Sequence, residues 1–328
     1  MKIAIVGAGA IGGLIGTRLA AAGHEVGALA RGATLAALRA HGWRLETAAG
    51  RVTAPVAGAS DRAADLGAQD LVVIALKATA LGAVVPTLGP LIGPHTLILP
   101  AMNGVPWWFC AGLPGFDAPL ASVDAGGAIS AALPVGQVIG CVVHASASVD
   151  APGLVRHRMG QGLIVGEAAG GRSARAQALA DVLAAAGFDV THSASVRRDV
   201  WYKLWGNMTM NPVSAITGAT IDRVLGDPLV RAFCSAAMDE AAAIGARIGC
   251  AIDQSADDRH AVTARLGAFR TSMLQDVDAG RPIELDAIVG AVREIGARLG
   301  IATPATDAIF GLARVFAQAR GLYAPPAA

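Results

Sequence analysis

Short uninterrupted runs of apolar residues recur through about the first 190 residues, separated by segments with helical spacing. Such short runs, bounded by turn residues, predict buried strands. We predict strands at residues 2–6, 25–29, 71–76, 96–99, 141–149 and 163–166. An apolar helix follows the first strand to about Ala22, and Gly23 ends it, so the first three elements form a βαβ unit. Strands that alternate with helices in this way predict a mostly parallel sheet.

After about Ser195 the pattern changes, and only helical spacing continues. Asp227 and Pro228 are a typical N-cap and first helical residue. Helices are predicted from Ser195 towards Ile216, from Asp227 to about Gly249, over Asp258–Asp278, from Pro282 to Gly300 and from Thr306 to Arg320. The predicted fold class is therefore α/β, with an α/β domain of residues 1–195 followed by an all-α domain of residues 196–328.

Three glycines follow the first strand in the pattern G-x-G-x-x-G. The first glycine permits a tight turn, the second lets a pyrophosphate approach the backbone, and the third lets the helix pack closely on the strand. The helix N-terminus then offers unpaired N–H groups to the phosphates. Because this motif joins a strand to a helix, it predicts a Rossmann-type dinucleotide-binding domain. The residues predicted at the cofactor are Gly7, Ala8, Gly9, Ala10, Ile11 and Gly12. A purely structural glycine turn is the alternative.

The residues after the second strand indicate which dinucleotide binds. NAD sites usually carry an acidic residue there for the ribose 2′-hydroxyl. This chain has Arg31 and no acid at that place. A guanidinium can pair with two oxygens of a 2′-phosphate, so NADP(H) is the predicted cofactor. Alternatively, Arg31 is a solvated loop residue.

A polar stripe marks the first helix of the all-α domain. Lys203, Asn207 and Asn211 are spaced four residues apart, so they project from one side of a helix that is otherwise rich in apolar residues. The stripe could be the solvated face of an amphipathic helix. Solvated faces usually carry several charges, however, and Lys203 is the only charged residue between Asp199 and Asp222. We therefore predict a functional stripe.

The composition narrows the class of protein. Hydrophobic residues make up 54% of the 328 and charged residues 16%, so the chain can bury sizeable cores, and its length suits about two domains. A net charge of +1 without a basic cluster argues against a nucleic-acid partner. Residues 125–149 are uncharged but rich in Gly and Ser, so we expect buried strands there and no membrane-spanning helix. The first residues form a strand and are not expected to be a signal peptide.

The four cysteines are scattered and form no C-x-x-C motif. This spacing argues against a metal site and against a disulfide scaffold, and it fits the reducing cytoplasm. We expect Cys110, Cys141, Cys234 and Cys250 to act as small buried hydrophobic residues. The sequence leaves open whether the chain forms a homodimer.

Over nearly its whole length the chain resembles the ketopantoate reductase (2-dehydropantoate 2-reductase) family. The specific part of the resemblance is a lysine–asparagine–asparagine-proline helix with a later serine and glutamate. The matching residues are Gly7–Gly12, Lys77, Asn103-Gly104, Trp201–Leu204, Asn207, Asn211-Pro212, Ser272–Asp276 and Glu284–Asp286. The resemblance implies a Rossmann domain followed by a helical domain, NADPH as cofactor and a 2-keto acid as the small-molecule substrate.

The resemblance also implies roles for individual residues. Lys203 would be the general acid, and Glu284 would orient the substrate or cofactor and keep Lys203 charged. The implied substrate-binding residues are Asn103, Asn207, Asn211 and Ser272, and the further cofactor-binding residues are Lys77, Asn103, Ser146 and Glu284. Taken alone, Glu284 could compensate a helix dipole, and Ser272 could be an ordinary hydroxyl near the end of a helix.

Three departures from the family pattern concern the substrate. Ile221 stands where we align a substrate-binding asparagine, Met102 replaces a glutamine, and an aromatic cluster at 107–109 follows Gly104. We therefore expect 2-dehydropantoate to be a modest substrate beside a more apolar 2-keto acid. The tryptophans of the cluster could equally be core residues. Two further readings remain: an enzyme for another 2-keto or 2-hydroxy acid, and an NADP-binding regulatory protein without catalysis.

Overall fold

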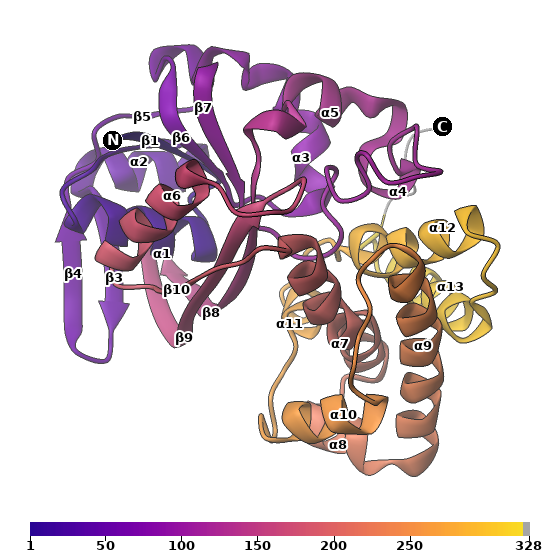
Figure 1. Ribbon diagram of the computed structural model, residues 1–328. Helices are drawn as coiled ribbons and strands as arrows, with labels where there is room; N and C mark the ends of the chain where they lie inside the picture. The colour runs from indigo at the N-terminus through magenta and orange to yellow at the C-terminus, as the bar shows by residue number, and fades with distance from the viewer. Residues whose placement is uncertain (324–328) are drawn as a thin grey trace. The chain divides into compact units, whose positions relative to one another are not determined.

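The computed structural model describes residues 1–323 of the chain. Contacts between residues divide the chain into two compact units (Figure 1). The first unit combines residues 1–102 with 128–199, and the second combines residues 103–127 with everything from Val200 onward. The segment 103–127, which the sequence predicts as part of the α/β domain, thus belongs with the helices of the second unit.

A parallel sheet of five strands forms one half of the first unit. Its strand order is β5-β2-β1-β6-β7, and every neighbouring pair is parallel. The strands are β1 (Lys2–Val6), β2 (Glu25–Leu29), β5 (Ala59–Ser60), β6 (Gln69–Ile74) and β7 (Ile92–Pro100). The helices that connect or follow them are α1 (Ala10–Ala21), α2 (Gly32–His41) and α3 (Ala78–Val84). The predicted α/β class and the βαβ unit at residues 2–29 are confirmed.

The other half of the first unit is a mixed sheet, which differs from the single mostly parallel sheet that the sequence predicts. Its long strands β8 and β9 pair antiparallel because only Pro152 and Gly153 join them, and a connection this short permits only a hairpin. The strands are β3 (Trp43–Thr47), β4 (Gly50–Ala54), β8 (Ile139–Ala151), β9 (Leu154–Glu167) and β10 (Asp189–His192). The short α5 (Ala128–Ala132) and the longer α6 (Ala174–Ala185) complete the unit.

Helix α1 joins the two sheets of this unit. It packs against β1 and β2 of the parallel sheet and against β3, β4, β8 and β9 of the mixed sheet. Its apolar residues Leu14, Ile15 and Leu19 are buried in one continuous core with side chains of both sheets and of α6. Buried apolar area is the main stabilising term in folding, so this core fixes the start of α1, where the glycine motif lies.

The second unit is built from helices, as predicted, and the described residues beyond Asp199 contain no strand. They are α7 (Val196–Thr217), whose first turn belongs to the first unit, α8 (Ile221–Gly226), α9 (Pro228–Arg247), α10 (Ala256–Ala264), α11 (Ser272–Asp278), α12 (Ala291–Arg298) and α13 (Pro304–Gln318). In segment 103–127, α4 (Ala121–Asp124) is a single turn. Asp227 caps α9 as expected, since its carboxylate accepts the N–H groups of Leu229 and Val230 at 3.0 Å each.

The single helix predicted over Asp258–Asp278 is wrong, because two helices occupy that range. Between them, the carbonyl groups of Gly267 and Phe269 accept the N–H groups of Asp222 and Ile221 and are not used in a helix. A new helix, α11, then begins at Thr271, whose hydroxyl accepts the N–H of Leu274 at 3.2 Å. Ser272 is therefore the first residue of α11 and does not lie near the C-terminal end of a preceding helix, where the sequence predicts it.

The helix predicted to begin at Pro282 starts three residues later, at Leu285. Its first turn, Asp286–Gly290, is π-helical, and α12 continues from Ala291. In a π-helix each N–H reaches back five residues, so local carbonyl groups change partners, and such turns are frequent at functional sites. Glu284 lies just before this turn, and its carbonyl accepts the Ile288 N–H at 3.2 Å.

Segment 103–127 is held to the helices of the second unit by polar and aromatic contacts. The Glu294 carboxylate accepts the N–H groups of Ala121 and Ser122 at 2.9 and 2.8 Å. Arg298 donates to the carbonyl groups of Ala118 and Pro119 at 2.7 and 2.6 Å. The aromatic residues of segment 103–127, namely Trp107, Trp108 and Phe109, are buried. Phe109 stacks on Trp201 of α7 with 5.7 Å between ring centroids. The aromatic cluster is therefore core.

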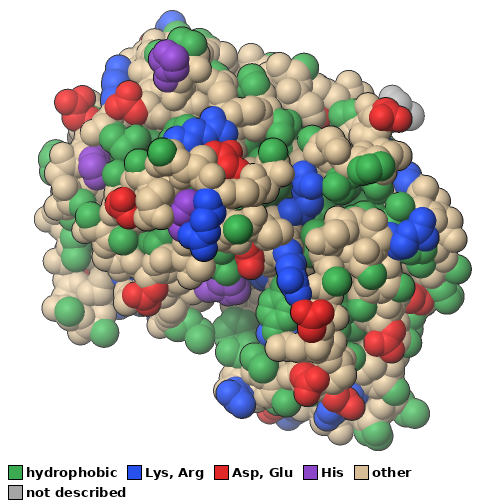
Figure 2. Space-filling model, viewed as in Figure 1, with side chains coloured by type: hydrophobic (Ala, Val, Ile, Leu, Met, Phe, Trp, Pro, Cys, Tyr) green, Lys and Arg blue, Asp and Glu red, His purple; other side chains and the backbone are tan. Residues whose placement is uncertain are grey.

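Three remaining expectations concern the cysteines, a membrane-spanning helix and the distribution of charge. All four cysteines are buried, as expected, and the described structure pairs none of them in a disulfide. Burial raises the pKa of Cys234 to about 12. No helix within residues 1–323 is long and apolar enough to cross a membrane. On the face drawn in Figure 2, basic and acidic side chains lie interspersed, in keeping with the near-zero net charge.

Candidate active site

The glycine motif lies at the carboxyl edge of the parallel sheet of the first unit. The register pairs Val6 with Leu29 and with Ile74, so β1, β2 and β6 end side by side. Gly7 follows β1 with φ +93°, a conformation that L side chains rarely adopt, and its N–H donates to Leu29 O at 3.2 Å. A Cβ on Gly12 would lie 2.0 Å from Gly7 O. Both positions therefore require glycine.

Gly9 differs from these two glycines because open space surrounds it. A Cβ added to Gly9 would meet no atom within 4 Å. Gly9 is the N-cap of α1. In the described structure no side chain caps this helix, and its first turn contains no acidic residue. The unpaired N–H groups and the positive end of the helix dipole thus face a space with room for an anion.

Two basic residues begin the helices that follow the neighbouring strands. Arg31 is the exposed N-cap of α2, just after β2, and Lys77 is the half-buried N-cap of α3, just after β6. With the glycine loop after β1, the three βα junctions bring Gly7–Gly12, Arg31 and Lys77 to one edge of one sheet, whereas Asn103 and Glu284 belong to the second unit. Edges of this kind bind ligands in open parallel sheets. Ser146 lies elsewhere in the unit, at a register shift of β8 opposite Met159 of β9.

The predicted general acid has a defined partner in the second unit. Lys203 Nζ donates a hydrogen bond to Asn103 Oδ1 at 2.9 Å, although the two residues are 100 positions apart. Lys203 lies on α7 and is half-buried, and Asn103 opens segment 103–127. The structure thus brings together two residues that the sequence assigned to one site. An amide oxygen against an ammonium orients that ammonium without removing its charge.

The stripe on α7 is not a solvated face. Asn211 is 5% exposed, and Lys203 and Asn207 are half-buried. The amide nitrogen of Asn211 is buried and has no hydrogen-bond partner among the described residues. An unpaired buried amide costs about 1–3 kcal/mol, so the position invites a ligand acceptor. These observations favour the functional interpretation of the stripe.

Glu284 and Ser272 lie in different settings. Glu284 is 9% exposed, and its neighbours Ile283 and Leu285 are fully buried. Carboxylates are rarely buried unless they have a specific role or partner, so simple dipole compensation at an exposed helix start does not describe Glu284. Ser272 is exposed at the start of α11.

Ile221 does not line a site in the described structure. It is 1% exposed and packs in an apolar cluster with Met210, Val213, Val224 and Cys234, among other residues. Its side chain is therefore part of the core of the second unit. Burial in this core gives Ile221 no contact through which it would weaken binding of a hydroxylated substrate.

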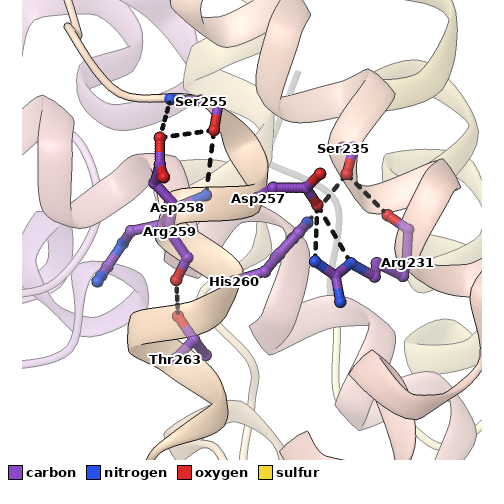
Figure 3. Close-up of polar contacts among 8 residues, drawn as sticks. All are labelled: Arg231, Ser235, Ser255, Asp257, Asp258, Arg259, His260 and Thr263. Atoms are coloured by element: carbon purple, nitrogen blue, oxygen red, sulfur yellow. Dashed lines mark hydrogen bonds and ion pairs between the residues drawn. The ribbon is translucent and has the colours of Figure 1, made fainter.

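A polar cluster between α9 and α10 also contains catalytic residue types, and Figure 3 shows its members. Ser235 Oγ lies 3.0 Å from His260 Nε2, and Asp257 pairs with Arg231 at 2.7 Å. The Ser235 hydroxyl, however, donates to the carbonyl of Arg231 at 3.1 Å, and His260 is 2% exposed. Burial, and then Arg231, lower the pKa of His260. We interpret the cluster as a structural link between the two helices.

Sequence reasoning missed the residues that support Asn103. Gly104 has φ +82°, and a Cβ there would lie 2.6 Å from the carbonyl oxygen of Ala287 in the π-helical turn. The next residue, Val105, donates its N–H to that same carbonyl at 2.8 Å. The resemblance included Asn103-Gly104, but only the fold shows that Gly104 lets the loop approach the turn after Glu284.

Two family models match the chain. Residues 3–170 match "Ketopantoate reductase PanE/ApbA", and residues 195–317 match "Ketopantoate reductase PanE/ApbA C terminal". A 2-dehydropantoate 2-reductase of Mesorhizobium japonicum is 43% identical, with 98% of this chain and 100% of the relative covered.

Solved structures give the same result. A protein of Ralstonia solanacearum MolK2 assigned as a ketopantoate reductase is 53% identical, with 98% of this chain and 99% of that chain covered and a TM-score of 0.94. The 2-dehydropantoate 2-reductase of Methylococcus capsulatus is 26% identical, with 98% of each chain covered and a TM-score of 0.85.

Proposed function

Because the chain belongs to the ketopantoate reductase family, we propose that it reduces 2-dehydropantoate to pantoate with NADPH as cofactor. Family members are oxidoreductases that reduce 2-keto acids. The observation that carries the proposal for this chain is the contact between Lys203 Nζ and Asn103 Oδ1. It supports Lys203 as an ammonium that is oriented by a neutral partner and remains able to donate a proton.

The glycine loop fits a dinucleotide. The space around Gly9, the uncapped start of α1 and the two tight glycine contacts are what a bound pyrophosphate requires. When bound, NADPH would supply the hydride for the keto carbon. Arg31 would hold the 2′-phosphate, because its exposed guanidinium follows β2 where NAD sites carry an acid. Lys77 begins α3 at the same edge and would contact the cofactor.

The second unit would supply the acid and the substrate contacts. Negative charge grows on the keto oxygen during reduction, and Lys203 would stabilise that charge and donate the proton. The unpaired Asn211 amide would donate to an acceptor of the keto acid, with Asn207 on the same stripe. Glu284 would orient the substrate or cofactor, Ser272 would bind the substrate, and Ser146 would border the nicotinamide.

A substrate panel tests this proposal. Purified protein is mixed with NADPH and with 2-dehydropantoate or one of a series of 2-keto acids of increasing tail size, and NADPH fluorescence is followed. We expect turnover with 2-dehydropantoate and a higher kcat/KM with NADPH than with NADH. Asn211→Leu, which removes the amide at similar volume, should raise KM by about 10-fold or more, the effect of one lost hydrogen bond to a charged group.

Two results would count against the proposal. Tight NADPH binding without turnover of any 2-keto acid would indicate a regulatory protein. A kcat/KM that is higher for every apolar keto acid than for 2-dehydropantoate would identify an apolar 2-keto acid as the substrate. The reaction type would stay the same.

A further inference from the structure

The last described residues lie against both sides of Glu284. The Ile283 N–H, just before Glu284, donates to the carbonyl of Leu322 at 3.1 Å. The hydroxyl of Tyr323 donates to Asp286 Oδ1, two residues after Glu284, at 2.9 Å. We call these two contacts the C-terminal clasp. Leu322 and Tyr323 are 38 and 39 positions away from Glu284 along the chain, so helix geometry alone does not account for the contacts.

The clasp is built from groups that are costly to leave unpaired. Burial raises the pKa of Asp286, while the Tyr323 hydroxyl and the positive charge of Arg314 oppose that shift. Burial, and then the bond to Asp286, raise the pKa of Tyr323 to about 12, so Tyr323 keeps its proton and remains a donor. Leu322 is also buried. A half-buried carboxylate without its donor would pull the turn towards water.

The turn that the clasp holds also supports Asn103. Asp286 begins the π-helical turn, and the carbonyl of Ala287 in this turn accepts the N–H of Val105. Val105 follows Gly104 and Asn103, and Asn103 accepts the hydrogen bond of Lys203. A chain of contacts thus runs from Tyr323 through the π-helical turn to Glu284 on one side and to the Asn103–Lys203 pair on the other.

We infer that Tyr323 is a positioning residue for the reaction: the C-terminal clasp fixes the turn that carries Glu284 and supports Asn103. This inference rests on the proposed function, in which Glu284 and Lys203 act on the substrate. Tyr323 itself acts only through Asp286 and the backbone of this turn.

The test uses Tyr323→Phe, which removes one oxygen and keeps the ring. We expect kcat for keto acid reduction to fall by about 10-fold, since small displacements of catalytic groups have effects of this size or larger. In a Glu284→Gln background the same substitution should lower kcat by clearly less than 10-fold, because the part of the effect that acts through Glu284 is already lost and only the part that acts through Asn103 remains. An equal loss of kcat in both backgrounds would overturn the inference.

Thr306→Val is the matched control. Thr306 lies at the other end of α13, and its hydroxyl donates to the Glu240 carboxylate at 2.7 Å. This variant also loses one buried hydrogen bond, so its Tm should fall while its kcat stays normal. If Tyr323→Phe behaves like Thr306→Val, with a lower Tm and a normal kcat, Tyr323 is structural only and the inference is wrong.

A readout without turnover separates this inference from the proposed function. Amide hydrogen exchange of residues 283–291 should accelerate in Tyr323→Phe and stay unchanged in Thr306→Val. If the wild type reduces no keto acid, the proposed function fails, yet the exchange result still shows whether the clasp holds the turn. Unchanged exchange in Tyr323→Phe would overturn the inference that the clasp holds this turn, even if the enzyme is active.

Discussion

The glycine loop of the first unit and the Lys203 region of the second unit are built in opposite ways. The loop offers backbone N–H groups at the start of α1, and its key contacts, such as that of Gly12 with Gly7, lie within the motif. The Lys203 region offers side chains, and its first contact joins residues 100 positions apart. The loop depends on glycine positions that carry no side chain. The Lys203 region is specified by a support of helices and loops.

The two regions are therefore vulnerable to different changes. A backbone site fails when a side chain fills its space, and the damage stays local. A side-chain site fails when its reacting group is removed or when a distant support moves, as with the Gly104–Ala287 approach. The following predictions test the two behaviours, beginning with the largest expected effect.

Lys203→Ala should lower kcat by roughly 10²–10⁴, the range for loss of a general acid. NADPH affinity should change little, because the predicted cofactor residues of the glycine loop belong to the other unit. Steady-state kinetics and NADPH fluorescence titration measure the two effects. Lys2→Ala, at an exposed position of β1, is the control and should react normally. Near-normal turnover of Lys203→Ala would remove Lys203 from the mechanism.

Gly9→Ala should raise KM for NADPH by about 10–10², because a methyl group would hold the phosphates away from N–H donors that contribute charged hydrogen bonds. Its Tm should stay near normal, since the added Cβ meets no atom within 4 Å. Gly12→Ala is the contrast: its Cβ would clash with Gly7 O, so its Tm should fall clearly. Normal NADPH affinity in Gly9→Ala would show that phosphates bind elsewhere.

Arg31→Ala should raise KM for NADPH by roughly tenfold and leave KM for NADH unchanged, because only NADPH carries the 2′-phosphate. Arg31 is exposed and makes no capping hydrogen bond through its side chain, so stability should not change. The ratio of the two KM values is the measurement. An equal rise for both cofactors would assign Arg31 to a solvated loop without a role in selection.

The smallest effect concerns the cluster between α9 and α10, where we expect stability to change and activity to remain. The pKa of His260 is lowered by burial, Arg231 and Arg259, with Asp257 acting in the opposite direction. The unfolded chain therefore takes up a proton below about pH 6.5 more readily than the folded chain, and stability falls as pH falls. His260→Gln should therefore lose less Tm than the wild type between pH 7 and pH 5. Equal losses would exclude His260 as the cause.

Local patterns predicted the strands that are buried on both faces and most of the helices. β1, β2 and β6 are continuous apolar runs, and α9 has both an N-cap and a proline to mark its start. β3 and β4 were missed because their residues are only partly buried and mix polar with apolar side chains. The break between α10 and α11 depends on backbone bonds to residues 221 and 222, which no local pattern contains.

The candidate site likewise has parts that the sequence predicted and parts that only the fold shows. The glycine motif was evident from six consecutive positions, and the close contacts of Gly7 and Gly12 agree with the predicted tight turn and close helix packing. The roles of Lys203, Asn103 and Glu284 came from the resemblance, and only the fold places Lys203 on Asn103. The burial of Ile221 was not predicted, because an apolar residue near a site in sequence can point into the core, whereas for Trp108 the sequence left core and site as equal alternatives.

The membership of segment 103–127 in the second unit has a consequence for synthesis on the ribosome. Its partners Glu294 and Arg298 follow 173 and 180 residues later, as the contacts of Ala121 and Ala118 show. At a translation rate of ~5–20 residues per second, the segment waits ~10–35 s for them. Phe109, which ends fully buried, waits as well for Trp201 of α7, the ring on which it stacks, because Trp201 follows 92 residues later. The emerging chain thus carries an uncovered aromatic stretch, which is the stretch where a chaperone that shields nascent chains would have its largest effect.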